Sequence, residues 1–167
     1  AKDREPMQLE MNVNDVIAAV VRPFESELAT RGVTLEQTLA PELPTLMAEK
    51  NALHRVFLNL FVNALDALDG VEERDRIIRM SSALADDGEA IDVTVWDSGC
   101  GIPASEIESI FGVFFSTKGS KGTGLGLAVS RKIVEEHRGT IAVQSEEGAW
   151  TEFRIQLPVE SRPTEKN

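Results

Sequence analysis

Two asparagines and an aspartate have types and spacing that suit metal and phosphate chemistry. Asn59 and Asn63 lie four residues apart in NLFVNALDA, and Asp66 follows three residues later, so on a helix all three project from one side. Amide oxygens are hard ligands that can hold a magnesium ion already carrying phosphate oxygens. Lone asparagines usually cap helices or face solvent. Two of them at contact spacing inside one helix weaken that purely structural interpretation without excluding it.

Asp97 stands directly ahead of glycine, glycine and proline residues in DSGCGIP, residues 97–103, at the end of an alternating apolar run. Glycine and proline in such a place fix a special backbone path. The pattern predicts a strand that ends in a tight loop, with the Asp97 carboxylate held there to bind a ligand. Cys100 in this loop is the only cysteine of the chain. We interpret it as a small apolar filler, and a redox role is the alternative.

Three glycines, Gly122, Gly124 and Gly126, cluster in KGTGLGLA at the start of an amphipathic segment. A helix N-terminus offers unpaired N–H donors and the positive end of its dipole, and glycines let phosphate approach that backbone. The cluster matches neither the Walker pattern nor the Rossmann fingerprint, since no Gly-Lys-Ser/Thr follows and no strand leads straight into it. A flexible loop is the plain alternative, so phosphate binding needs support from other motifs.

Helices and strands must position these groups. Apolar residues recur every three or four positions over 12–30, 51–68 and 124–137, which predicts three amphipathic helices. Pro23 lies inside the first, where a kink or a later helix start is expected. Strands are predicted at 33–39 and 45–49, in a hairpin over 76–96 with an Asp-Gly turn, and in a hairpin formed by 139–145 and 150–158. A short helical turn is expected near residues 103–110.

Helices and hairpin strands alternate irregularly along the chain. This favours an α+β two-layer sandwich, with three main helices on one face of a mixed, mostly antiparallel sheet. We expect one domain over residues 9–158, preceded by a remnant of an upstream segment (1–8) and followed by a polar tail (159–167). The first residue is not methionine, so we expect a fragment of a longer protein.

Composition excludes several functions. The net charge of −11 over 167 residues leaves no basic surface for nucleic acid. The single cysteine allows no internal disulfide, which fits a reducing compartment. No apolar run approaches the roughly 20 residues of a membrane span, and no signal peptide opens the chain. We therefore expect a cytoplasmic domain without membrane contact, although its parent protein can be membrane-anchored.

Four segments in a fixed order resemble a known family. The asparagine-bearing helix, DSGCGI, FGVFFSTK and GTGLGLA together resemble the catalytic ATP-binding domain of sensor histidine kinases, in the superfamily of gyrase, Hsp90, histidine kinases and MutL. Each segment alone is weak, whereas the four in order are specific. The resemblance covers residues 9–158 and implies a Bergerat-type ATP-binding fold.

The resemblance implies a role for each matching residue. Asn63 would coordinate magnesium, and Asn59 would assist near the phosphates as a catalytic residue. Asp97 would accept a hydrogen bond from the exocyclic amine of adenine, with Gly99 and Gly101 letting the backbone lie close to the base.

The remaining segments would contact the phosphates and, through water, the base. Lys118, which ends FGVFFSTK, would reach the phosphates as a catalytic and binding residue. The third residue of this segment is Val113, at a position where relatives usually carry proline. Lys121 and the second glycine box would close over the triphosphate, and Thr151 would contact adenine through water. The box residues are Gly122, Gly124, Leu125 and Gly126. The short GSKG segment implies a small lid over ATP, similar to that of nitrogen-regulator and transport-sensor kinases.

Three classes of function compete within this resemblance. Gyrase-like and MutL-like ATPases carry a water-activating glutamate where this chain has Asn59, which cannot act as a general base. We therefore favour phosphoryl transfer to a protein histidine. An anti-sigma-factor-type serine kinase and a nucleotide-sensing module without transfer activity remain alternatives.

The phosphoacceptor is expected elsewhere. Neither His54 nor His137 is followed by an acidic residue, as an acceptor histidine would be. The resemblance implies an acceptor on a separate dimerisation domain of the parent protein, which in turn would serve a response regulator receiver domain. We interpret His137 as complementing the dipole of its helix, and expect the fragment itself to be a monomer.

Overall fold

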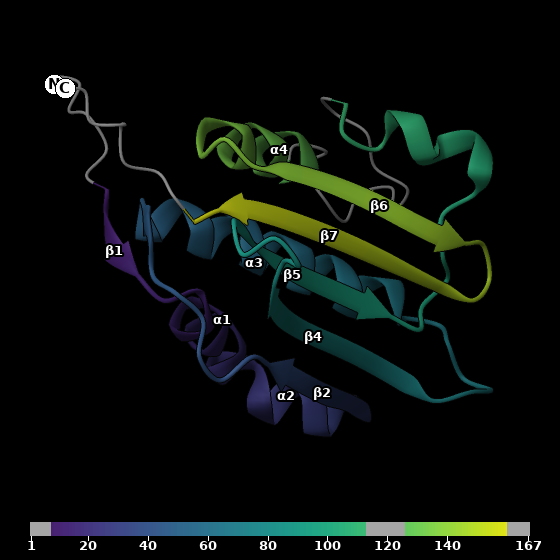
Figure 1. Cartoon of the computed structure of the whole chain (residues 1–167). Helices are drawn as coiled ribbons and strands as arrows, with labels where there is room; N and C mark the ends of the chain where they lie inside the picture. The colour runs from purple at the N-terminus through teal and green to yellow at the C-terminus, as the bar shows by residue number, and fades with distance from the viewer. Residues whose placement is uncertain (1–7, 113–125, 160–167) are drawn as a thin grey trace, which may run out of the picture.

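The central sheet joins five strands in an order that differs from their order along the chain. In the computed structural model, which describes residues 8–112 and 126–159, the strand order is β2-β4-β5-β7-β6 (Figure 1). The strands are β2 (Val33–Leu39), β4 (Arg76–Leu84), β5 (Ala90–Asp97), β6 (Thr140–Glu146) and β7 (Trp150–Pro158). Only the β2–β4 pair of this sheet is parallel. The expected mixed, mostly antiparallel sheet is confirmed.

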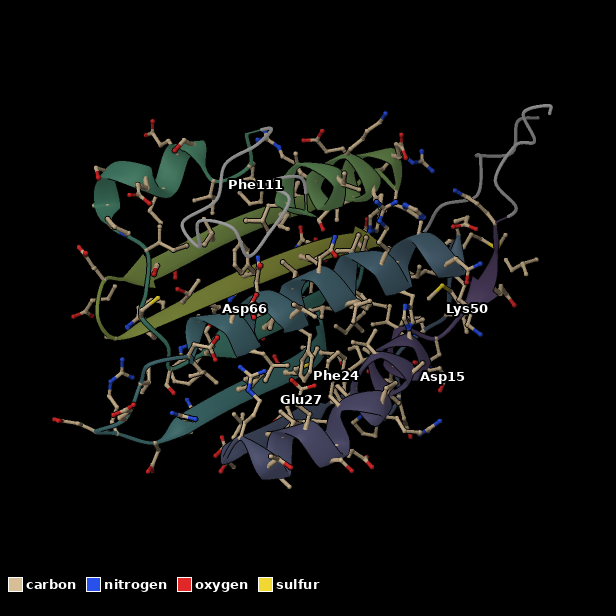
Figure 2. All side chains as sticks on the ribbon, turned by 180° about the vertical axis from the view of Figure 1, so that it is seen from behind. Asp15, Phe24, Glu27, Lys50, Asp66 and Phe111 are labelled. Carbon is tan, nitrogen blue, oxygen red and sulfur yellow. The ribbon has the colours of Figure 1, made fainter. Side chains whose placement is uncertain are left out.

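Helices cover one face of the sheet. The longest, α3 (Lys50–Ala67), packs against β5 and lies between α1 (Val13–Val21) and α4 (Gly126–Glu136). The helices lie behind the sheet in Figure 1 and in front of it in Figure 2. The predicted two-layer α+β architecture with helices on one face is therefore confirmed.

The first predicted helix is interrupted at Pro23. Here α1 ends at Val21, a 3-10 turn (η1) covers Arg22–Phe24, and α2 (Glu25–Thr30) follows. Proline lacks an N–H donor and its ring clashes with the preceding helical turn, so the helix bends, which was one of the two expected outcomes. The ring of Phe24 (Figure 2) lies 5.1 Å from that of Phe61 on α3, which anchors the bend to the core.

The two faces of the sheet differ in chemistry. Alternate residues of β5 such as Val93 and Val95 are buried toward the helices, and Asp97 continues this buried series. On the opposite face the Arg79 guanidinium lies 4.4 Å from the ring centroid of Trp96. The strand alternation of β5 therefore directs the Asp97 carboxylate to the helix side of the sheet.

A small second sheet joins the N-terminal part of the chain to the segment before α3. Strand β1 (Leu9–Met11) pairs antiparallel with β3 (Leu46–Ala48). Strand β3 was predicted and β1 was not, because three residues show too little alternation to identify. The short helical turn predicted near 103–110 is the 3-10 helix η2 (Ala104–Ser109). Within the part of the chain that the structure describes, no helix has the length and apolar content needed to cross a membrane.

Candidate nucleotide-binding site

The asparagine pair lies on α3 where this helix meets the start of α4. Asn59 donates from Nδ2 to the carbonyl of Gly126, at 3.2 Å, and to Oγ of Ser130, at 3.1 Å. Asn63 and Asp66 follow on the same side of α3 and are half-buried; Figure 2 marks Asp66 near the C-terminal end of this helix. The asparagine helix and the glycine-rich helix start therefore meet at Asn59 and Gly126.

These contacts give Asn59 a definite structural task. Its amide donors are used for α4, and the fully buried hydroxyl of Ser130 is one of the two acceptors. The amide therefore fixes the first turn of α4 relative to α3. Ser130 was not identified from the sequence, because a serine inside an amphipathic helix gives no signal of its own.

Asp97 and Thr151 form a buried polar pair at one end of the sheet. They are register partners on β5 and β7, and their exposed fractions are 4% and 3%. Oδ1 of Asp97 accepts a hydrogen bond of 2.8 Å from the backbone N–H of Gly99. The hydroxyls of Thr151 and Ser145 lie 2.8 Å apart. The structure therefore brings together two residues that the sequence placed 54 positions apart.

The glycines after Asp97 are required by close backbone contacts. A Cβ atom on Gly99 would lie 2.5 Å from the carbonyl oxygen of Ala67 at the end of α3. A Cβ on Gly101, where φ is +73°, would lie 2.8 Å from Cα of Glu147 in the β6–β7 turn. Only glycine fits at both places. The exposed Cys100 stands between them, and its carbonyl accepts from the N–H of Gly148 at 2.6 Å.

One arginine that sequence reasoning missed completes this region. Arg74 donates to the carbonyls of Ser98, Gly99, Gly148 and Ala149, and three of these distances are 3.0, 2.9 and 3.4 Å for Gly99, Gly148 and Ala149. Its neighbours in VEERDRII are charged, so the sequence alone suggested only a solvated loop. The long-range contacts are what distinguish it.

Several predicted site residues lie outside the described residues. These are Lys118, Lys121, Gly122, Gly124 and Leu125. Their expected roles toward the phosphates stay predictions. Gly126, the last glycine of the cluster, is the first residue of α4.

Both ring nitrogens of His137 make hydrogen bonds within the fold. Its Nδ1 donates to the carbonyl of Ile133 at 2.9 Å, and its Nε2 accepts from the N–H of Glu49 at 3.1 Å. The first contact satisfies a carbonyl at the C-terminal end of α4, in line with the structural interpretation. The second joins that end to Glu49, whose side chain caps α3 through the N–H of Ala52.

The donor set can be tested against a bound metal ion. Among residues 8–112 and 126–159, no group of three or more His, Cys, Asp or Glu side chains is arranged to hold a metal. Magnesium, however, usually keeps waters and phosphate oxygens and takes only one or two protein ligands. Asn63 is half-buried and lies one turn from Asn59 on α3. Its amide fits a site of this kind, with one or two protein ligands, better than a site in which protein groups alone hold the ion.

Comparison with known proteins identifies the class. The family described as histidine kinase-, DNA gyrase B- and HSP90-like ATPase matches residues 48–161. The sensor histidine kinase ZraS of Klebsiella oxytoca is 38% identical over 149 residues, which is 89% of this chain and 31% of that protein. The chain thus spans about a third of this curated relative.

Solved structures of histidine kinases are also similar to this chain. The catalytic domain of histidine kinase ThkA superposes with a TM-score of 0.78 at 31% identity, covering 91% of this chain and 97% of that one. ThkA in complex with the response regulator protein TrrA matches with a TM-score of 0.75 at 28% identity, over 92% of this chain and 42% of that one.

The chain belongs to the histidine kinase-, DNA gyrase B- and HSP90-like ATPase family. Within this family it is a catalytic ATPase domain of the sensor histidine kinase type. The predicted family and fold class are confirmed, and the chain is homologous to the catalytic domains of sensor histidine kinases.

Proposed function

We propose that the domain binds Mg-ATP and donates its γ-phosphoryl group to a histidine on a separate dimerisation domain of the parent protein. The observation that carries this proposal is the buried pair of Asp97 and Thr151 at the loop of close-packed glycines. A buried carboxylate beside a loop of close-packed glycines suits an acceptor for an exocyclic amine. Asp97 would accept from adenine, and Thr151 would contact the base through water.

The phosphates would lie toward the asparagine side of α3. Asn59 holds the first turn of α4 in place, so the N-terminal end of α4 would present its positive dipole end to the phosphate chain. Lys118, Lys121 and the glycines from Gly122 onward would close over it. Magnesium, when bound through Asn63, would neutralise charge on the phosphate oxygens.

The transfer itself needs little chemistry from the protein. An imidazole nitrogen of the acceptor histidine forms a bond to the γ-phosphorus while the bond from that phosphorus to the bridging oxygen breaks, and ADP leaves. Positioning and charge neutralisation dominate such reactions. Asn59 stands where related hydrolases carry a general base, and an amide cannot activate water. Donation to a protein is therefore preferred over hydrolysis.

The relatives supply the partner class. ThkA has been solved in complex with a response regulator protein, and we extend this to the parent of the present chain: the phosphohistidine would pass its phosphoryl group to a receiver domain. A serine kinase or a nucleotide-sensing module would share the ATP site, so the acceptor decides between these functions.

Two measurements test the proposal. Titration calorimetry with ATP and magnesium should show binding by the isolated chain, and chelation of magnesium should weaken it. Absence of a heat of binding at millimolar ATP, where even about 4 kcal/mol of affinity is detected, would overturn ATP binding. Labelled ATP should then transfer phosphate to an added histidine-bearing hairpin. Acid-stable phosphoserine on a protein substrate instead would favour the serine-kinase alternative.

A further inference from the structure

Arg74 occupies an unusual position relative to the Asp97–Thr151 pair. Its guanidinium donates to the carbonyls of Ser98 and Gly99, which directly follow Asp97. It also donates to those of Gly148 and Ala149, which belong to the turn just before Thr151. One side chain thus joins the two backbone segments that carry the pair.

The geometry suits arginine in particular. A guanidinium offers five N–H donors in a planar fork, whereas a lysine ammonium is a compact charge with three donors on a flexible stem. Four carbonyl acceptors from two separate segments can be met together by the fork. The acceptors are backbone atoms, so the contact depends on the path of the loop and not on the identity of its side chains.

The β5–β7 pairing ends at Asp97 and Thr151, and two further hydrogen bonds join the segments beyond it. The N–H of Gly148 donates to the carbonyl of Cys100 at 2.6 Å, and the N–H of Ile102 donates to the hydroxyl of Ser145 at 2.8 Å. These two contacts are made three and five residues after Asp97, by Cys100 and Ile102. Arg74 contacts the residues that immediately follow Asp97, where a shift would move the carboxylate most.

We propose that Arg74 is a positioning residue for adenine recognition, which fixes the Asp97 carboxylate relative to Thr151 by holding both backbones. The inference rests on the proposed function, since it assigns a supporting residue to the adenine site. Arg74 acts through the backbone, so removing it leaves Asp97 and Thr151 present but imperfectly placed for the base.

The test uses Arg74→Gln, Arg74→Lys and a matched control, Arg76→Gln. Arg76 also ties backbone carbonyls, those of Val71 at 2.7 Å and Arg31 at 2.9 Å, but none in the adenine loop. ATP affinity is followed by the fluorescence of Trp96 and Trp150, the two tryptophans of a chain without tyrosine. Thermal unfolding is measured for every variant, and Arg74→Lys, which keeps the charge, serves if Arg74→Gln does not fold.

We expect Arg74→Gln and Arg74→Lys to weaken ATP binding by about tenfold, and Arg76→Gln by less than about twofold at a similar loss of thermal stability. A double-mutant cycle separates positioning from general destabilisation. In an Asp97→Asn background, Arg74→Gln should change ATP affinity by less than about twofold, because its target is already removed.

Two failures can be told apart. If Asp97→Asn binds ATP as the unmodified chain does, the adenine assignment itself is wrong. If Asp97→Asn weakens binding while the Arg74 variants match Arg76→Gln, or if the effects of Arg74→Gln and Asp97→Asn are additive, then the positioning inference is wrong and the adenine assignment stands.

Discussion

Asp97 and Thr151 lie directly opposite each other on β5 and β7, and both polar side chains are almost completely buried. Buried polar groups are normally hydrogen-bonded. Here Asp97 accepts from the N–H of Gly99, and the hydroxyl of Thr151 meets that of Ser145. Ordered hydrogen bonds therefore hold these two polar groups at the end of an apolar sheet.

Replacing Asp97 by asparagine should weaken ATP binding by about 10- to 100-fold, because a hydrogen bond to a charged group contributes about 1.5–3 kcal/mol. GTP binding should stay poor, since guanine presents a carbonyl where adenine has its amine. Calorimetry with both nucleotides measures the effect. Asp92→Asn is the matched control: Asp92 lies on the other face of the same strand, where it accepts from Gln156. Equal losses in the two variants would contradict the assignment.

Gly101→Ala should destabilise the domain and abolish detectable ATP binding. The positive φ alone costs an alanine about 1–2 kcal/mol, and its Cβ would also collide with backbone of the β6–β7 turn. Gly88→Ala provides the comparison, because Gly88 has a φ of +75° but open space around it. Thermal unfolding and fluorescence titration should show a small loss of stability for Gly88→Ala with unchanged binding. A Gly101→Ala protein that binds ATP normally would show that the loop can move aside.

Asn63→Ala should reduce phosphoryl transfer more than Lys118→Ala does. The amide oxygen of Asn63 would be a direct magnesium ligand, whereas Lys118 would be one charge among several over the phosphates. Transfer is measured in the protein reconstituted with its histidine-bearing hairpin. Asn51→Ala, an exposed asparagine in the first turn of the same helix, should leave transfer unchanged. A milder defect in Asn63→Ala than in Lys118→Ala would reverse the two roles.

Neither histidine should become phosphorylated when the isolated chain is incubated with labelled ATP. Both ring nitrogens of His137 are engaged, by Ile133 and Glu49. His137 also follows the far end of α4, whose residues rise about 1.5 Å each, so it is distant from the phosphates expected at Gly126. His54 shares the rigid helix α3 with Asn59 but projects to a different side.

Acid-labile label is measured before and after adding a hairpin that carries an acceptor histidine. Only the hairpin should become labelled, because in-line transfer needs the nucleophile within roughly 3–3.5 Å of phosphorus. Stoichiometric phosphohistidine on the isolated chain would contradict this division of labour.

Local patterns predicted the elements well where they were long. The alternation in β5 and the wide apolar stripe of α3 are strong signals, and both elements lie within a residue or so of their predicted limits. Pro23 predicted the position at which the first helix would be interrupted, but not whether the helix would bend there or begin later. Strand β1 was missed because its three residues pair with β3 residues that lie 35 to 39 positions away in the sequence, and no local pattern contains that information.

For a related reason, some residues of the site were predicted from the sequence and others were not. Asp97, Gly99 and Gly101 stand in one short motif, and residue type alone indicates a constrained carboxylate loop. Ser130 and Arg74 act through partners 71 and up to 75 residues away. Their types are ordinary in a surface helix and a charged loop, so only the folded chain distinguishes them from their neighbours.

The placement of β7 has a consequence for how the molecule forms. This strand is the last of the described chain, yet it lies between β5 and β6 in the sheet. A growing polypeptide therefore has β5 and β6 available before the strand that separates them exists. Their edges, with unpaired backbone groups, are the ones prone to wrong pairing. The domain cannot complete its sheet from one end to the other, and the pairing that brings Thr151 to Asp97 is among its slowest, most non-local steps.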